Sequence, residues 1–453
     1  MPTYHIQTHG CQMNYSDTER MEAYLEALGF TKAAFDEADL LMFNTCSIKQ
    51  KAEDKVFGTL KQVSDMKRRH KNLKVAITGC MVRKSSSRYS TTRDRLFFRS
   101  QEIDIALRTE ELPKLASLLR EIDPDSKIKS IKEEGLEDYF QIQPNYASNA
   151  QAFVAVSTGC DKFCTYCIVP FSRGREKSRT LTDILNECKA LVESGCKEIT
   201  LIGQTVNSYG LSVHDRMEKK FADLPKGKEP FVYLLEQLDK LHAKGLERVR
   251  FTSPHPKDMS DRLIDAMATL KTQMPYLHLP VQSGDNRVLK RMNRTYTIEK
   301  YRALVKKIRA RIPDISISTD IIIGFSGESD EEFESTYKFF KEMNFEHAYL
   351  SEYSQRRGTY AAKNIKDDVP AGIKNKRWHK LNNLLKKLSA KALSRFVGMT
   401  VPVLVEHQEG ARCLGRSPHF KRVSFNSKKN LLGQIVPIKI TKSLLWDLEG
   451  KLV

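Results

Sequence analysis

Three cysteines stand close together in the run STGCDKFCTYC, with the spacing C-x3-C-x2-C. They are Cys160, Cys164 and Cys167. Three thiolates can ligate three irons of a four-iron cluster, which leaves the fourth iron open to another ligand. A metal with an open position is reactive, as in catalytic zinc sites. The spacing therefore predicts a catalytic iron–sulfur cluster.

Zinc binding and simple core packing are the alternatives for the same cysteines. Zinc motifs usually have a second ligand pair about 12 to 20 residues further along the chain. The next cysteine is Cys188, and no histidine lies between Cys167 and Cys188. We therefore favour the iron–sulfur cluster.

The cysteine run resembles the signature of radical S-adenosylmethionine (SAM) enzymes, which have an aromatic residue beside the last cysteine. Tyr166 occupies that position here. The resemblance implies that the amino and carboxylate groups of SAM bind the open iron. One electron would then cleave SAM to methionine and a 5′-deoxyadenosyl radical. The protein's part in such chemistry is to position and shield the cofactor.

Length and charge limit the class of protein. The chain has 453 residues, enough for two to four domains that each bury a core. It has 75 Lys and Arg against 56 Asp and Glu, a net charge of +19. This excess favours a nucleic acid as partner, with a membrane surface as the weaker alternative. No apolar run is long enough to cross a bilayer and no signal peptide is evident, so we expect a cytoplasmic protein with reduced cysteines.

Residues 1–118 alternate between strand and helix patterns, which predicts an open parallel α/β sheet domain. Three of the predicted strands end next to Cys11, Cys46 and Cys80. Because ligands bind beyond the carboxyl ends of parallel strands, we expect these cysteines to converge at one sheet edge. Small residues precede them and leave room for a bulky inorganic ligand. Burial as three core cysteines is the alternative.

The next two segments have weaker signals. Residues 83–100 are basic and rich in Ser and Thr, which favours an exposed loop over an RNA-binding site. Residues 119–147 mix charges with little periodicity, so we predict a linker.

Residues 148–385 repeat the strand-then-helix pattern six times, which predicts a full or partial βα barrel with its site at the carboxyl ends of the strands. Polar residues and glycines follow the later strands, and glycines let the backbone approach a ligand closely. The run IIGFSGE resembles the SAM-contacting strand end of radical SAM barrels. With the cysteine loop, it implies the following SAM contacts: Tyr166, Gln204, Ser253, Gly324, Gly327 and Glu328.

Residues 386–453 continue a basic helix and then show five short strand patterns. This predicts a small all-β barrel, a frequent nucleic-acid-binding module. Its side chains with the charge or ring needed to hold RNA are Arg416, His419, Lys421, Arg422 and Phe425.

Longer runs extend the resemblance to the whole chain. QTHGCQMNYSDTERM, FNTCSIKQKAEDK, ITGCMVRK and HLPVQSGDNRVLKRMNR are similar to the methylthiotransferase family, and residues 386–453 look like its RNA-binding TRAM domain. The basic stretch 83–100 departs from the usual family pattern. The resemblance implies a second [4Fe–4S] cluster on Cys11, Cys46 and Cys80. It also implies methylthiolation at C2 of an N6-isopentenyl (dimethylallyl) adenosine at position 37, beside the tRNA anticodon, with two SAM molecules.

Several alternatives and partners accompany this interpretation. Other family branches modify a threonylcarbamoylated adenosine in tRNA or an aspartate of a ribosomal protein, and spacing does not separate them. A noncatalytic iron–sulfur protein that binds RNA is the alternative from another class. The resemblance also implies a flavodoxin- or ferredoxin-like electron donor, a sulfur donor system and a monomer. Three cysteines remain, which we expect to be buried structural thiols: Cys188, Cys196 and Cys413.

Overall fold

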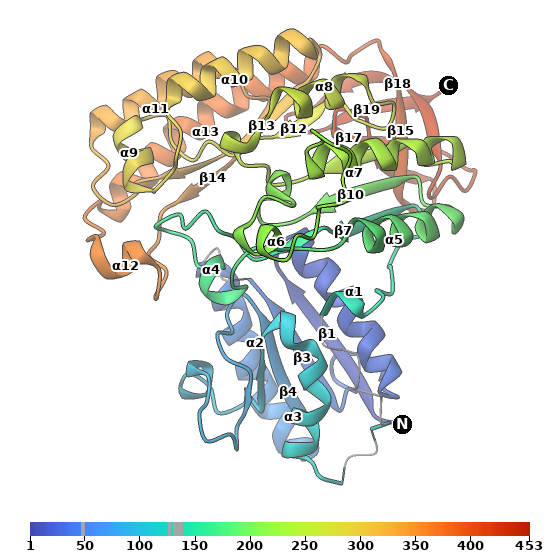
Figure 1. The fold of residues 1–453 in the computed structure, drawn as a ribbon, viewed down its shortest axis with the longest axis vertical. Coiled ribbons are helices and arrows are strands. Elements are labelled where there is room, and N and C mark those ends of the chain that lie inside the picture. The colour runs from blue at the N-terminus through green and yellow to red at the C-terminus, as the bar shows by residue number, and fades with distance from the viewer. Residues whose placement is uncertain (47–49, 126–127, 130–138) are drawn as a thin grey trace.

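The first part of the chain forms a six-stranded sheet with helices on both faces. The computed structural model describes residues 1–46, 50–125, 128–129 and 139–453. The strand order is β2-β1-β3-β4-β6-β5, and β1, β3, β4 and β6 run parallel. The elements of this part, in the lower half of Figure 1, are β1 (Thr3–His9), α1 (Gln12–Ala27), β2 (Thr31–Lys32), β3 (Leu40–Thr45), α2 (Gln50–Arg69), β4 (Lys74–Gly79), β5 (Ser86–Ser87), η1 (Arg95–Phe98), β6 (Ile105–Leu107), η2 (Thr109–Lys114), α3 (Leu115–Ile122) and η3 (Tyr139–Gln141).

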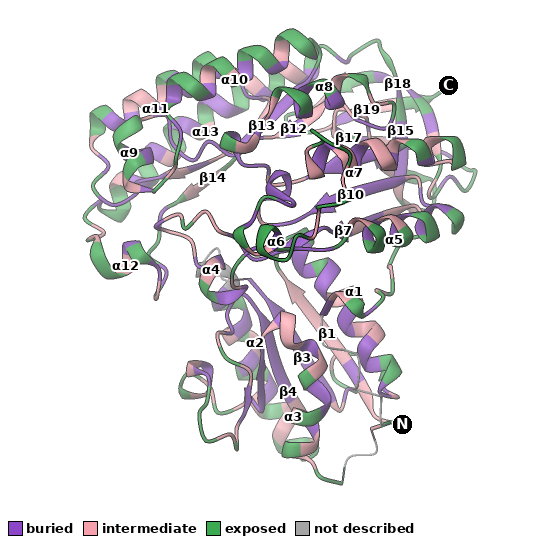
Figure 2. Cartoon of the chain, in the orientation of Figure 1, coloured by how far each residue is buried: buried purple, intermediate pink, exposed green. Residues whose placement is uncertain are grey.

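Side-chain alternation in the central strands explains the two helix layers. Leu40 and Met42 of β3 pack in one core with α1 and α3, whereas Leu41 and Phe43 pack with α2 on the other face. Successive side chains of a strand point to opposite faces, so a strand covered on both sides must be apolar throughout. Strands β3 and β4 are buried over almost their whole length (Figure 2). The predicted parallel α/β domain is confirmed.

Six parallel strands form a partial barrel in the middle of the chain. Strands β7, β10 and β11 form one sheet and β12, β13 and β14 the other, and a bridge between Val249 and Gln273 connects them. No pairing joins β7 to β14 among the described residues, so the barrel is open on that side. Its elements are β7 (Gln151–Ala155), β8 (Ser157–Thr158), α4 (Val169–Ser172), β9 (Lys177–Ser178), α5 (Leu181–Glu193), β10 (Glu198–Ile202), η4 (Val206–Ser208), α6 (Val213–Met217), α7 (Pro230–Asp239), η5 (Lys240–Lys244), β11 (Arg248–Phe251), η6 (Pro256–Asp258), α8 (Asp261–Thr269), β12 (Tyr276–His278), α9 (Asn286–Arg291), α10 (Ile298–Arg311), β13 (Ser316–Ile323), α11 (Asp330–Met343), β14 (His347–Glu352), α12 (Tyr360–Asn364) and α13 (Ala371–Ser394).

The two faces of the barrel strands differ in polarity. Ile199 and Leu201 of β10 pack against the outer helices, while Glu198 and Thr200 of the same strand line an inner cavity. The outer face therefore supplies the core, and the polar inner face is free to contact a ligand.

A closed five-stranded barrel ends the chain, at the upper right of Figure 1. Val403, Cys413 and Ile438 are among the residues that fill its core. The predicted small all-β barrel is confirmed. Its strands, in the order β15-β16-β17-β19-β18, are β15 (Thr400–Glu409), β16 (Arg412–Arg416), β17 (Arg422–Asn426), β18 (Ile435–Ser443) and β19 (Leu448–Leu452).

Helix α13 joins the two barrels without a break and contacts both β14 and β18. The predicted boundary after residue 385 falls inside this helix. It stays a prediction, as do the boundaries after residues 118 and 147. Within the predicted linker 119–147, residues 126–127 and 130–138 lie outside the described residues. None of the described helices is long and apolar enough to cross a membrane.

Buried ion pairs join helix α1 to the partial barrel. Arg20 of α1 pairs with Glu187 of α5 at 3.3 Å, and Glu187 also pairs with Arg179. Asp17 of α1 pairs with Arg173. Removing one member of such a buried pair typically costs about 3–5 kcal/mol, because the other charge is left unpaired. These pairs therefore hold the N-terminal sheet in one orientation on the barrel.

Candidate active site

Cys11, Cys46 and Cys80 follow the carboxyl ends of the three neighbouring parallel strands β1, β3 and β4. The last residues of these strands are aligned in the register. The backbone N–H of Cys80 donates to the carbonyl of Thr45 at 2.8 Å, and Cys11 is the N-cap of α1. The expected convergence at one sheet edge is thus seen, while the role of these cysteines as ligands stays a prediction.

Hydrogen bonds between polar side chains stabilise this edge, and two buried polar atoms beside the cysteines have no partner among the described residues. Asn14 Nδ2 donates to Asn44 Oδ1 at 2.9 Å, and Asn44 Nδ2 donates to the backbone oxygen of Asn14 at 2.7 Å. The Cys11 thiol lies 3.5 Å from Asn14 Oδ1. His9 Nε2 and Thr78 Oγ1 are buried without a hydrogen-bond partner among the described residues. Because buried polar atoms are normally partnered, and cluster sulfurs accept hydrogen bonds, this environment fits an iron–sulfur cluster.

The second cysteine set lies in the cysteine loop, residues 160–167. Backbone geometry shapes its entry and its middle, since Gly159 has φ +76° and Phe163 has φ +48°. A Cβ on Gly159 would lie 2.1 Å from the carbonyl oxygen of Arg175, so only glycine fits there. Asn293 Nδ2 holds the strained Phe163 by donating to its carbonyl at 2.9 Å.

Two side chains contact the thiols of this loop, Thr205 beyond the end of β10 and Arg294 between α9 and α10. Thr205 Oγ1 and Cys160 Sγ lie at a hydrogen-bonding distance of 3.5 Å, and Arg294 Nη1 donates to Cys164 Sγ at 3.5 Å. Burial raises the pKa of Cys160 to about 11. A thiol must lose its proton before it can ligate iron, so the iron ions of a cluster and the Arg294 guanidinium would both stabilise the thiolate.

Arg173 lies between the two cysteine sets. Burial by itself lowers the pKa of its guanidinium, but Asp17 and Cys80 raise it well above its ordinary value. Burial and the neighbouring Cys164 raise the pKa of Cys167, and Cys80 of the other set raises it further. Cys80 therefore lies near both Arg173 and Cys167. Gly174, the residue after Arg173, accepts a hydrogen bond of 3.2 Å from the Cys160 N–H, so Arg173 links the surroundings of the two sets.

In the part of the chain that the structure describes, no three His, Cys, Asp or Glu side chains converge closely enough to hold one metal ion. A four-iron cluster is larger than one ion, and its thiolate ligands lie farther apart.

Glu328 shapes the glycine-rich turn after β13. Its Oε2 accepts hydrogen bonds from the Gly324 N–H and from Arg377 Nη1, both at 2.8 Å, and its side chain is 1% exposed. Gly324 has φ +68° and Gly327 has φ +74°; a Cβ on Gly324 would lie 2.4 Å from the side chain of Lys374. Gly324 is thus packed against Lys374, whereas Gly327 is exposed. A direct contact between Glu328 and SAM stays a prediction.

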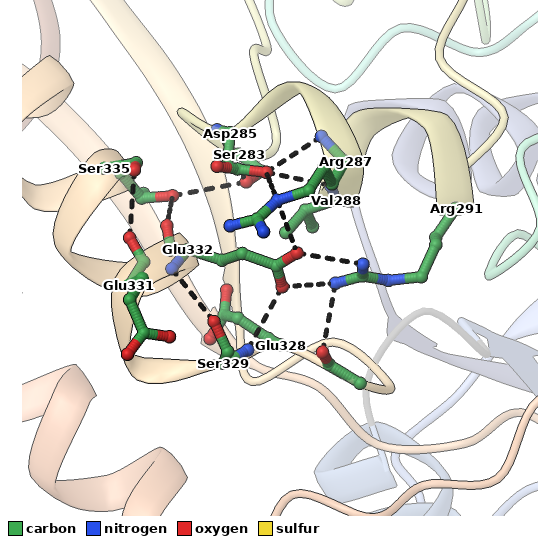
Figure 3. A network of polar contacts seen from close by, with 12 residues as sticks. Ser283, Asp285, Arg287, Val288, Arg291, Glu328, Ser329, Glu331, Glu332 and Ser335 are labelled. Atoms are coloured by element: carbon green, nitrogen blue, oxygen red, sulfur yellow. Dashed lines mark hydrogen bonds and ion pairs between the residues drawn. The ribbon is translucent and has the colours of Figure 1, made fainter.

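Arg291 connects this turn to the cysteine loop. Its Nη2 donates to the Gly327 carbonyl at 3.2 Å, and its guanidinium pairs with Glu332 (Figure 3). Its own carbonyl accepts a hydrogen bond of 2.8 Å from the Thr165 hydroxyl. Ser329 and Glu332 form the predicted capping box of α11. One network thus fixes the loop and the turn relative to each other.

The other expected SAM contacts lie around the same rim. The Tyr166 ring meets Phe325 of the glycine-rich turn edge to face, with centroids 6.3 Å apart. Gln204 Oε1 is buried and has no hydrogen-bond partner among the described residues. Ser253 has φ +57°, which is uncommon for a residue other than glycine. The structure brings these three residues to one rim, and their contacts with SAM stay predictions.

A cavity of about 330 Å³ lies inside the partial barrel, lined by residues of β7, β10, β11, β12 and β14. This volume lies in the usual range for ligand sites, about 300–1,000 Å³. All three parts of the chain line it. The lining includes Gln12 and Tyr15 of α1, Phe153, Tyr276 and Tyr349 of the barrel strands, Ser253 at a strand end, and Arg416 and Phe420 of the small barrel.

One wall of the barrel interior is polar. His278 Nε2 lies 3.3 Å from Asp320 Oδ2, and the Tyr276 hydroxyl shares a hydrogen bond of 2.8 Å with Ser318. Tyr349 packs edge to face against His278, with ring centroids 5.7 Å apart. Such a wall offers hydrogen bonds to the edge of a flat heteroaromatic ligand and aromatic faces to its rings.

Glu19 also lines the cavity and is expected to make stability depend on pH. Burial raises the pKa of its carboxyl to about 7, with a smaller opposing effect from the Ala147 N–H. Arg20 also lowers this pKa, whereas Glu22 and Glu187 raise it. Between about pH 4.5 and about pH 7, Glu19 of the folded protein therefore keeps a proton that the same carboxyl has released in the unfolded chain. Stability should be full below about pH 4.5 and decline as the pH rises through about 7.

In the Glu19→Gln variant, the free energy of unfolding should fall by roughly 1–2 kcal/mol less than in the parent over this pH range. Urea unfolding of the metal-free protein at several pH values measures the difference. An equal decline in the variant and the parent would contradict the assignment.

Most residues of the small barrel that were expected to bind RNA are engaged inside the protein. Phe425 belongs to the barrel core, and Lys421 forms a buried ion pair of 2.6 Å with Glu346. The prediction of RNA contacts is wrong for these two residues, because the loop that carries Lys421 docks on the partial barrel. The other three pair as follows: His419 with Asp314, Arg416 with Glu406 and Arg422 with Asp447.

Cys188, Cys196 and Cys413 are buried, as expected. Cys188 and Cys196 lie in the core of the partial barrel, and Cys413 lies in the core of the small one.

Three residues beside the cysteines were not predicted from the sequence. They are Arg173, Thr205 and Arg294. Arg173 and Arg294 lie in basic runs whose ordinary explanation is a solvated surface, so their burial was not evident. Only the fold brings Arg294 beside Cys164, which lies 130 residues away in the chain.

Protein-family models match three segments of the chain. The radical SAM superfamily matches residues 154–340, the uncharacterized protein family UPF0004 matches residues 3–98, and the TRAM domain matches residues 394–453. The tRNA-2-methylthio-N(6)-dimethylallyladenosine synthase of Geobacillus kaustophilus is 39% identical over 457 residues, which cover 99% of this chain and 82% of that protein. The chain belongs to the radical SAM methylthiotransferase family.

Other methylthiotransferases match over the same length. The proteins of the same name from Clostridium novyi and Bacillus subtilis are 39% and 38% identical over 99% of this chain, covering 96% and 86% of their own lengths. Among solved structures, the radical S-adenosylmethionine methyltransferase TsrM from Kitasatospora setae has a TM-score of 0.56 at 14% identity, covering 86% of this chain and 89% of its own. That likeness supports the fold alone.

Proposed function

We propose that this methylthiotransferase adds a methylthio group to C2 of the N6-dimethylallyl adenosine beside the tRNA anticodon. The observation that carries the proposal is the pair of three-cysteine sets, linked through Arg173 and its ion pair with Asp17, together with a cavity lined by all three parts of the chain. The relatives bear the name of synthases that make this product in tRNA. The TRAM domain and the net charge of +19 support a tRNA partner.

The cysteine loop would hold the cluster that binds SAM. Radical SAM enzymes use SAM with a [4Fe–4S] cluster, which supplies a carbon radical able to take hydrogen from an unactivated aromatic carbon. Such a C–H bond offers no proton that a side chain can readily remove, so acid–base catalysis alone is insufficient. Thr205 and Arg294 would orient the thiolates, and the glycine-rich turn after β13 would seat SAM.

Cys11, Cys46 and Cys80 would hold a second [4Fe–4S] cluster, which supplies the site of the sulfur to be transferred. Arg173 would lie between the two clusters and offset the negative charge of their thiolates. Its buried ion pair with Asp17 keeps the guanidinium in place and links the cysteine edge to α1.

The cavity favours an apolar N6 substituent over the charged threonylcarbamoyl group. Recognition of a carboxylate calls for a free cationic fork. Two arginines line the cavity. Arg250 has no free nitrogen to offer, because Nε pairs with Glu198 at 2.9 Å and both terminal nitrogens donate to backbone carbonyls of the small barrel. Arg416 pairs through Nη1 with Glu406 at 3.6 Å. Phe153, Tyr276 and other rings supply apolar area instead. The threonylcarbamoyl and ribosomal-protein branches remain the alternatives that the assay below tests.

An arginine cluster marks where the tRNA backbone would bind. It comprises Arg83, Arg95, Arg99 and Arg357, at the junction of the N-terminal sheet and the segment after β14. Arg83 donates to the backbone carbonyl of Arg357. Burial lowers the pKa of Arg83 and Arg95, and the nearby Arg357 lowers both further. Phosphates would relieve this mutual repulsion, so the basic stretch 83–100 is better explained by RNA binding than as a tolerant surface loop.

The surroundings of the cluster suit a single-stranded anticodon loop. Phe98 is 78% exposed, and the Arg93 guanidinium lies 5.7 Å from its ring. Exposed rings beside basic side chains can stack unpaired bases. The cluster is also near the cysteines. Arg356, the residue before Arg357, has a pKa that burial lowers, and the nearby Glu53 and Cys46 partly offset that effect.

Replacing Arg99 and Arg357 together with Gln should weaken binding of an anticodon stem-loop and flatten its salt dependence. The slope of log affinity against log salt should fall by about 0.7 for each phosphate that the variant no longer neutralises. The matched control is Arg302→Gln with Arg311→Gln, two exposed, ion-paired arginines of α10. Equal slopes for both double variants and the parent would remove the cluster from the RNA interface.

Nucleoside mass spectrometry tests the proposed function. The anaerobically reconstituted protein is incubated with SAM, a reductant and tRNA that carries dimethylallyl adenosine, with unmodified and threonylcarbamoylated tRNA alongside. We expect a mass gain corresponding to methylthio in place of hydrogen on the dimethylallyl nucleoside only. A gain on the threonylcarbamoyl nucleoside, or 5′-deoxyadenosine without any tRNA product, would overturn the substrate assignment.

The chain is an enzyme, so the noncatalytic alternative is wrong. A flavodoxin- or ferredoxin-like electron donor, a sulfur donor system, a monomeric state and a cytoplasmic location are further parts of the proposal.

A further inference from the structure

The loop between β16 and β17, residues 417–421, docks against the amino-terminal end of the partial barrel. Arg250 donates from its two terminal nitrogens to the carbonyls of Ser417 and Pro418, at 3.0 and 2.9 Å. Arg248 donates to the carbonyl of Arg416 at 2.9 Å. Both arginines are almost fully buried. The small barrel is therefore built into the catalytic barrel at this point.

Phe420 is the residue that this docking presents to the cavity. Its ring stacks on Tyr276 of β12, with centroids 4.7 Å apart and planes 25° apart. The guanidinium groups of Arg250 and Arg416 lie 5.1 and 4.4 Å from the ring centroid. Cation–π contacts of this kind fix the orientation of a ring that is only partly buried.

The backbone of Phe420 is held in a conformation that bulky residues avoid. Its φ is +61°, and its N–H donates to the Ser417 carbonyl at 2.9 Å. A bulky residue with positive φ costs on the order of 1–3 kcal/mol and persists only where the surroundings impose it. Packing of the small barrel alone does not explain this strain, because the ring lies outside the core of that barrel.

We propose that Phe420 closes the floor of the substrate cavity and limits the length of the N6 substituent. This inference rests on the proposed function. Ser253, beyond the carboxyl end of β11, and Gln12, which follows Cys11, line the cavity. Phe420 stacks on Tyr276 at the amino-terminal end of β12 and so lies on the opposite side.

The chemistry of the base directs the N6 substituent toward Phe420. C2 of the adenine must face the clusters, because the methylthio group is added there. N6 is attached to C6, on the other side of N1 from C2, so the C6–N6 bond and the reacting C2–H bond leave the ring in different directions. A short branched alkene would then lie among Phe420, Tyr276 and Phe153, where apolar contact stabilises it.

Two tRNA stem-loops that differ only in the N6 group test the proposal. One carries dimethylallyl adenosine and the other the longer geranyl analogue. The parent enzyme should modify the first and scarcely the second. Phe420→Ala should raise the geranyl-to-dimethylallyl ratio of kcat/KM by about tenfold or more, since a missing side-chain group in an apolar pocket alters discrimination by this order.

Controls separate specificity from folding. Phe420→Leu keeps an apolar floor and should shift the ratio less, and it replaces Phe420→Ala if that variant unfolds. Leu432→Ala, at an exposed site of the small barrel, should leave the ratio unchanged. Equal ratios in the Phe420 variants and the parent, with iron content intact, would overturn the inference. A parent enzyme that forms 5′-deoxyadenosine but modifies neither stem-loop would instead overturn the proposed function.

Discussion

Cys164→Ala is expected to abolish formation of 5′-deoxyadenosine from SAM, by at least about 10³-fold. Three thiolates are the minimum that holds a four-iron cluster with one open iron, and groups that act as a unit lose most of the activity when one is removed. Arg294, whose Nη1 lies 3.5 Å from this thiol, would be left without its partner. Chromatography of the reaction products and the iron content per chain measure the effect.

The matched control for this variant is Cys188→Ala, because Cys188 is buried in the same barrel away from the loop. It should keep its iron and its SAM cleavage. Affinity for tRNA should stay within about twofold in both variants, since the phosphate contacts that dominate affinity lie elsewhere. Undiminished 5′-deoxyadenosine from Cys164→Ala would show that the cluster is assigned to the wrong residues.

Cys80→Ala is expected to separate the two halves of the reaction. The variant should lose the methylthiolated nucleoside while still forming 5′-deoxyadenosine, because the cysteine loop keeps its own ligands. The iron content should fall from about eight to about four atoms per chain, as expected for loss of one of two [4Fe–4S] clusters. Mass spectrometry of the tRNA nucleosides and an iron assay on the same sample give both readouts.

Cys413→Ala provides the control for this second variant, since Cys413 fills the core of the small barrel. It should keep both the product and the full iron content. Retention of about eight irons and of the product by Cys80→Ala would mean that Cys80 is a core thiol, the alternative left open by the sequence.

Spacing and strand pattern were enough to predict both cysteine sets. Cys160, Cys164 and Cys167 lie within eight residues, so local chain geometry alone brings them together. Cys11 and Cys80 are far apart in the chain, yet their convergence was predictable because parallel strands end at a common edge. The βα rhythm likewise predicted the partial barrel, and five short strand patterns predicted the small one.

The contacts that the predicted residues make were harder to predict from the sequence. Lys421 and Phe425 have the residue types of an RNA site, and nothing local distinguishes a solvated lysine from one that pairs with Glu346 of another domain. Glu328 has the position of a SAM contact, and the structure uses its carboxylate to hold the turn at Gly324. Type and position specify what a side chain can do, whereas its partner depends on packing over long distances.

By itself, the sequence determined the chemistry: two sets of three thiols, the order of three domains and an excess of positive charge. These features depend on local spacing, strand periodicity and composition, which are properties of short segments. Only the tertiary structure decided that Cys80 lies near Cys167 and Arg173, that Phe420 lines the cavity, and that Arg83 contacts Arg357. Each of these contacts joins residues that are distant in the chain. Their orientation follows from the buried ion pairs of α1 and the docked loop 417–421, which no local pattern encodes.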